Sequence, residues 1–96
     1  MNLPDGYWRV ERTGGLLPPM IGVRKRVRGG RGETRVGPLL RWPFQLEDRV
    51  EHVALTYEPP FSSWVDELRP GEPGLWFGTA TLGGRTLGHF RMVWIG

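Results

Sequence analysis

Few residues in this chain could carry acid–base chemistry, and the clearest pair lies near its carboxyl end. His89 and Arg91 are two positions apart, so their side chains point the same way in an extended strand. A histidine exchanges its proton near neutral pH, and an arginine can stabilise developing negative charge. If this row faces a cavity, His89 could move a proton beside Arg91. The alternative is that both residues are structural.

Two further residues, Tyr57 and Asp66, could also donate or accept a proton. Asp66 and Glu67 are neighbours, so a strand turns them to opposite faces and they cannot act as a facing carboxylate pair. Asp66 shares a face with Trp64, where it could act in catalysis or form an ion pair with Arg41, Arg91 or His89. Whether the protein is an enzyme stays open, and the catalytic candidates are His89, Tyr57 and Asp66.

Aromatic residues could form the wall of a cavity or an ordinary core. Tyr57, Trp64 and Trp76 offer flat apolar area with a polar tip. A metal site is not expected, because the chain has two histidines and no cysteine. No cofactor is expected either, because no helix follows the glycines around Arg31 and Arg85 to receive a phosphate.

The segment 24–35 is the densest basic stretch, in a chain with 13 basic and 10 acidic residues. A basic hairpin could follow the phosphate backbone of single-stranded nucleic acid, with Trp42 or Phe44 stacking on bases. The alternative is a solvated hairpin whose charges protect a sheet edge. Nucleic-acid binding is therefore the less favoured interpretation.

The elements that must position these residues are strands. The 15 glycines and nine prolines interrupt the chain about every ten residues, and no helical period survives between them. We expect a single domain over 1–96, an all-β antiparallel barrel of about seven or eight strands. The expected strands are 7–13, 21–28, 33–36, 38–44, 50–57, 61–68, 75–82 and 86–95, with turns at Gly29-Gly30 and Gly83-Gly84 and, at most, one helical turn near 16–20.

The last expected strand has two apolar faces. Phe90, Met92 and Trp94 form the row opposite Arg91. If the Arg91 row faces inward, this second row is packed by a loop or forms a homodimer patch, because a large exposed apolar stripe is unusual on a monomer.

Gly6-Tyr7-Trp8 in the first strand, together with Arg91 in the last, resembles the paired signature of the lipocalin and wider calycin barrels. The resemblance implies that Trp8 plugs the closed end of a barrel and that Arg91 packs against its ring. It also implies a cavity for a small apolar molecule.

We therefore predict binding of a small hydrophobic or mixed-polarity ligand, with Trp8, Tyr57, Trp64, Trp76, His89 and Arg91 as binding candidates. The alternatives are a cofactor-free cyclase or isomerase using the same cavity, and single-stranded nucleic-acid binding. We expect a cytoplasmic protein without a membrane partner, because the sequence shows neither a secretory signal nor a spanning segment.

Overall fold

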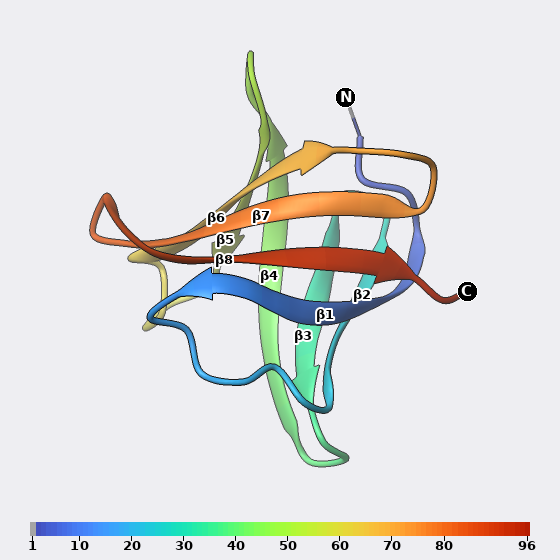
Figure 1. Ribbon diagram of the computed structural model, residues 1–96, viewed down its shortest axis with the longest axis horizontal. Coiled ribbons are helices and arrows are strands. Elements are labelled where there is room, and N and C mark those ends of the chain that lie inside the picture. Colours follow the sequence, from blue (N-terminus) through green and yellow to red (C-terminus); the bar gives the residue numbers. More distant parts are fainter. Residues whose placement is uncertain (1) are drawn as a thin grey trace.

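In the computed structural model, which describes residues 2–96, the chain forms eight antiparallel strands and no helix. Each strand pairs with its neighbour in the chain, and the last strand pairs with the first, so the sheet closes into a barrel (Figure 1). This confirms the all-β barrel predicted from the sequence. The strands are β1 (Gly6–Gly15), β2 (Val23–Arg28), β3 (Arg31–Val36), β4 (Leu40–Asp48), β5 (Val53–Tyr57), β6 (Trp64–Pro70), β7 (Leu75–Leu82) and β8 (Arg85–Trp94).

The barrel is flattened into two layers. In Figure 1, β6, β7, β8 and β1 run across the view, whereas β2 to β5 run steeply behind them. Because the sheet is closed, each of the eight strands within residues 2–96 pairs with a neighbouring strand on both sides over at least part of its length. Side chains that point inward from both layers form one core.

Tight glycine turns join two of the hairpins, as the sequence predicts. Gly29 and Gly30 have φ values of 62° and 77°, and Gly83 and Gly84 have values of 58° and 82°. Two successive positive φ angles are the requirement of the two-residue turn that matches the twist of a hairpin. By contrast, residues 16–20 form no helical turn and belong to the irregular loop that joins β1 to β2. Pro18 and Pro19 lack the amide hydrogens that a helical turn would use there.

One end of the barrel is closed by the segment that precedes β1. Trp8 is fully buried, and its Nε1 donates a hydrogen bond of 3.0 Å to the carbonyl oxygen of Pro4. Leu3 is buried in the same core. Trp8 and Leu3 therefore fix the segment before β1 against this end of the core.

The inward row of β8 is the apolar one. Phe90 and Met92 are 3% and 0% exposed, and only Trp94, at the end of the strand, is half exposed. The expected dimer patch of Phe90, Met92 and Trp94 is therefore not a surface stripe. Phe90 fits because its ring lies over Gly78 on β7, where an added Cβ would come within 2.2 Å of that ring.

Candidate functional site

The interior of the barrel contains a buried lysine. Val23, Lys25 and Val27 form the inward row of β2, and Lys25 is only 3% exposed. An ammonium group taken out of water is costly unless other groups pair with it. The surroundings of Lys25 must therefore supply both hydrogen-bond acceptors and a negative charge.

Three other strands, β3, β5 and β6, provide these partners. The Nζ of Lys25 donates to Thr34 Oγ1 on β3 at 2.7 Å and to the hydroxyl of Tyr57 on β5 at 2.9 Å. The Thr34 and Tyr57 oxygens are themselves 2.8 Å apart and share a hydrogen bond. On β6, the Oδ2 of Asp66 lies 3.6 Å from Nζ, and Asp66 is 5% exposed. We call Lys25, Thr34, Tyr57 and Asp66 the polar cluster.

Aromatic rings surround the ammonium group on its remaining sides. The Lys25 Nζ lies 5.5 Å from the ring centroid of Phe44, 5.4 Å from that of Tyr57 and 5.8 Å from that of Phe90. Cations within about 6 Å of a ring face are attracted to it. Phe44 and Tyr57 also meet edge to face, with centroids 6.1 Å apart. These rings hold the cluster while excluding water from one side of it.

The environment shifts the pKa values of both charged groups. Burial opposes the charged form of Lys25, but attraction to the oxygens of Tyr57 and Asp66 outweighs it and raises the pKa above its ordinary 10.5. Burial also raises the pKa of Asp66 above its ordinary 3.8, and the attraction of Lys25 offsets only part of this effect. Lys25 is therefore a stable cation at neutral pH, and Asp66 is the group that binds a proton more readily than usual.

The polar cluster lines a cavity inside the barrel whose wall does not include Trp8. The cavity holds about 280 Å³, and the loop between β1 and β2 forms part of its wall (Figure 1). Lys25, Thr34, Tyr57 and Asp66 supply its polar groups. Its other walls are mostly apolar and include Val10, Leu17, Val23, Trp64, Ala80 and Phe90.

A second hollow adjoins this cavity and shares two of its lining residues. It holds about 320 Å³ and is lined by Trp42, Tyr57, Phe61 and Trp64. Trp42 and Phe61 meet edge to face with centroids 6.5 Å apart. Because Tyr57 and Trp64 border both spaces, the polar cluster and this aromatic hollow lie side by side.

The structure brings together only some of the residues singled out from the sequence. Tyr57, Trp64 and Asp66 all border the cavity. Trp8 and Trp76 are 0% and 6% exposed and belong to the core, outside the cavity wall. These two tryptophans shape the barrel but do not line the cavity.

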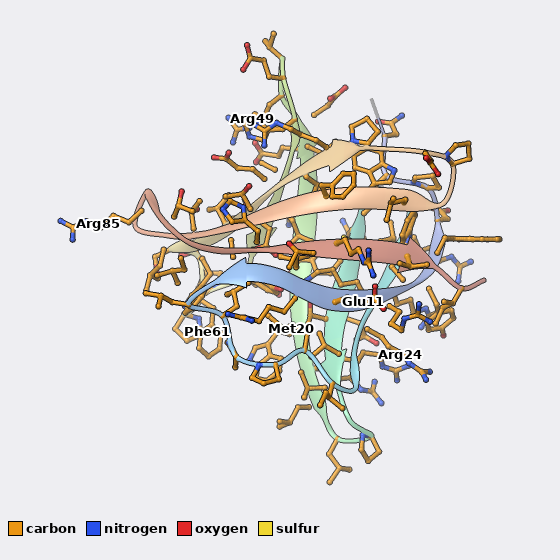
Figure 2. All side chains as sticks on the ribbon, viewed as in Figure 1. Glu11, Met20, Arg24, Arg49, Phe61 and Arg85 are labelled. Carbon is orange, nitrogen blue, oxygen red and sulfur yellow. The ribbon has the colours of Figure 1, made fainter. Side chains whose placement is uncertain are left out.

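His89 and Arg91 lie on the outer face of β8. Arg91 donates a hydrogen bond of 2.5 Å to Glu11, which lowers the pKa of that carboxyl (Figure 2 labels Glu11). His89 is exposed, and its Nδ1 lies 3.4 Å from Thr79 Oγ1. The expectation that Arg91 packs against Trp8 is therefore wrong, because Phe90 and Met92 fill the inner face and turn their neighbours outward.

The basic stretch 24–35 forms the β2–β3 hairpin, and its charges divide between two faces. Arg24, Arg26 and Arg28 point outward and are exposed, whereas Lys25 points inward. Sequence reasoning treated Lys25 as an interruption of the pattern and missed its role. The available signal was its place in the alternation, midway between the inward residues Val23 and Val27.

The arrangement of residues 2–96 bears on metal binding and on membrane spanning. No group of three or more His, Cys, Asp or Glu side chains comes together there as a metal site would require. Those residues also contain no helix that is long and apolar enough to cross a membrane.

The structure establishes an eight-stranded antiparallel barrel, which is the architecture that the lipocalin resemblance implied. It buries Trp8 and turns Arg91 to the outer face. Comparison of the chain with protein-family models, with curated proteins and with solved structures gave no match.

Proposed function

We propose that the barrel binds a small molecule in the cavity beside Lys25. The observation that carries the proposal is the Lys25–Asp66 pair, which is buried and also lines a cavity. A buried ion pair is a poor stabilising device, because its desolvation roughly offsets its attraction and apolar replacements are often as stable. Charged groups with shifted pKa values that converge on a mostly apolar cavity are typical of binding sites.

The polar cluster favours a ligand without net charge. The Lys25 ammonium and the Asp66 carboxylate neutralise each other, and Lys25 already donates to Thr34 and Tyr57. A ligand would therefore meet the Asp66 carboxylate and the Tyr57 hydroxyl. A hydroxyl or amide group on the ligand could donate to Asp66 and orient the molecule.

The remaining walls favour an apolar body with a flat part. The cavity of about 280 Å³ is just below the range of about 300–1,000 Å³ for ligand pockets, and the adjoining aromatic hollow adds space beside it. Trp42, Phe61 and Trp64 offer ring surfaces there. The proposed ligand is thus a mixed-polarity molecule of a few hundred daltons.

The lipocalin or calycin relationship is part of the same proposal. Gly6-Tyr7-Trp8 and the burial of Trp8 at the closed end support it. The outward position of Arg91 departs from the family pattern. We therefore take the ligand class from the cavity and not from the family.

Native mass spectrometry of the protein purified from its own host tests the proposal. We expect an additional mass of a few hundred daltons that is lost under denaturing conditions. Ala80 lines the cavity and is 4% exposed, so Ala80→Leu should fill part of the space and reduce the bound fraction. Arg91→Ala, on the outer face, is the control and should keep the ligand. A bare mass for the wild-type protein, together with no uptake from a host lipid and metabolite extract, would contradict the proposal.

A second candidate function is proton-transfer catalysis in the same cavity, as in a cofactor-free isomerase or cyclase. The observation that favours it is the raised pKa of Asp66 beside the Tyr57 hydroxyl and the Lys25 ammonium. Asp66 or Tyr57 would move the proton, and Lys25 would stabilise developing negative charge. If the identified ligand is converted to an isomer, Asp66→Asn should abolish conversion while binding persists. His89→Ala should change neither, because His89 lies outside.

A further inference from the structure

A cluster of exposed aliphatic side chains lies at one tip of the barrel. The backbone nitrogen of Gly37 donates to the oxygen of Gly22 at 3.3 Å, which joins the β1–β2 loop to the β3–β4 turn. Beside this contact, Ile21, Leu39 and Leu40 are 90%, 86% and 53% exposed. We call these three residues the aliphatic tip. Aliphatic groups that gather on two adjoining loops and remain in solvent mark a contact surface.

A row of arginines crosses the outer face next to this tip. Four arginines on β1 to β4 are direct cross-strand partners, namely Arg9, Arg24, Arg35 and Arg41. Because neighbouring strands are about 4.8 Å apart, this arginine row spans about 14 Å. Like charges that face each other across strands destabilise a sheet. An anionic partner would explain why the row is present.

Two members of the row have no acidic neighbour. Arg9 and Arg35 form ion pairs with Glu11 and Glu33 on their own strands, at 3.3 and 3.2 Å. Among residues 2–96, no carboxylate lies within 4.0 Å of the Arg24 or Arg41 guanidinium group. Their positive charge is therefore available to a partner. Figure 2 shows Arg24 at the lower right, far from Arg49 at the top and Arg85 at the far left.

A hollow lies between the arginine row and the two loops beside the aliphatic tip. It holds about 350 Å³ and is lined by Arg24 and Arg35 together with Gly22, Gly37 and Pro38 of the two loops. Exposed aliphatic groups flanked by arginines are suited to the surface of a bilayer, where the apolar groups enter the interface and the cations meet lipid phosphates. We propose that the aliphatic tip and the arginine row dock the barrel onto membranes rich in anionic lipid.

The aliphatic tip distinguishes lipid from nucleic acid as the partner. A nucleic-acid backbone would use the arginines but would leave the aliphatic groups in water, and single-strand binders stack bases on aromatic rings. The nearby Tyr7 ring is already covered by the Arg26 guanidinium group, 5.9 Å from its centroid. Our expectation of no membrane partner rested on the lack of a spanning segment, and peripheral docking needs none.

Vesicle flotation measures this docking directly. The wild-type protein should float with vesicles of phosphatidylcholine and phosphatidylglycerol in equal amounts, should not float with phosphatidylcholine alone, and should be released by high salt. The double variant Arg24→Gln with Arg41→Gln should weaken binding about 25-fold, because each cation near an anionic surface strengthens the affinity about fivefold. Ile21→Ser with Leu39→Ser should weaken it at least about tenfold.

The chain offers a matched control for each pair of substitutions. Arg85→Gln removes one exposed arginine at the start of β8, and Val50→Ser removes a 97% exposed aliphatic side chain between β4 and β5. Neither control should change flotation. Circular dichroism of each variant checks that the barrel is intact.

Three results would overturn the proposal. They are no flotation of the wild-type protein with anionic vesicles, an equal loss in the control variants, and binding that depends on the arginines but not on Ile21 and Leu39. In the third case, an affinity for a labelled single-stranded oligonucleotide that exceeds the affinity for anionic vesicles would assign the arginine row to nucleic acid. Ile21 also borders the ligand cavity, whereas Arg24, Leu39 and Arg41 do not, so the occupancy of that cavity is decided separately with the Ala80→Leu variant.

Discussion

Replacing Lys25 with methionine isolates the energetic role of the buried ion pair. Two unit charges 3.6 Å apart attract by about 4–5 kcal/mol at an effective dielectric constant of about 20. Methionine fills similar volume but leaves the Asp66 carboxylate buried without its cation. We expect Lys25→Met to lower the free energy of unfolding by about 3–5 kcal/mol, the range found when one partner of a buried pair is removed. A chain of 96 residues has about 5–14 kcal/mol in total.

The double variant Lys25→Met with Asp66→Leu separates the cost of the unpaired charge from the loss of packing. With both charges removed, the interior becomes apolar, and the free energy of unfolding should return to within about 2 kcal/mol of the wild-type value or exceed it. The double variant should also lose the bound ligand. A stable barrel with an empty cavity would show that the pair serves binding more than folding.

Urea unfolding followed by tryptophan fluorescence measures both variants. With a slope of about 2 kcal/mol per molar urea, the midpoint of Lys25→Met should fall by about 2 M. A fall of less than about 0.5 M would refute the reasoning, because it would mean that water or a protonated Asp66 already relieves the charge. So would a double variant that is no more stable than Lys25→Met.

The remaining predictions concern one group each. Because the pKa of Asp66 is raised on folding, its protonation stabilises the folded state below about pH 3.8, and this contribution is lost as pH rises through the folded pKa. As pH rises through that pKa, the free energy of unfolding of Asp66→Asn should therefore increase relative to that of the wild type. If the free energies of unfolding of the two proteins change equally with pH, the pKa of Asp66 is not raised. Trp8→Ala should cost about 3–5 kcal/mol in urea unfolding, because it empties the closed end, and a cost below about 1 kcal/mol would contradict that role. Arg91→Ala should leave the urea midpoint unchanged, since the side chains of Arg91 and its partner Glu11 are 50% and 33% exposed; a large loss would place Arg91 in the core after all.

The strands could be predicted because their signals are local. Glycine and proline pairs mark the turns, and alternation correctly assigned Trp8 and Val10 to one face of β1 and Trp64, Asp66 and Leu68 to one face of β6. These patterns depend only on residues two positions apart. The barrel followed from the number of such strands.

The polar cluster could not be predicted because its partners are distant in the sequence. The Lys25 side chain meets Thr34, Tyr57 and Asp66, which come from three other strands. A lysine is rarely buried without a partner, so without knowledge of Asp66 it is expected to face solvent. The orientation of β8 was ambiguous for a different reason, since both of its rows carry apolar residues such as Leu87 and Phe90.

Closure of the sheet by β1 and β8 also bears on how the chain could be reconnected. The backbone nitrogen of Ile95 donates to the oxygen of Tyr7 at 2.8 Å, and the Trp94 indole donates to the oxygen of Asp5 at 3.1 Å. The start of β1 and the end of β8 are therefore neighbours in space. A short peptide linking these ends, with a new opening between Gly83 and Gly84, would keep all eight strand pairings. Circular permutants of this kind should therefore fold to the same ring, because neighbour-to-neighbour pairing gives the barrel no unique starting strand.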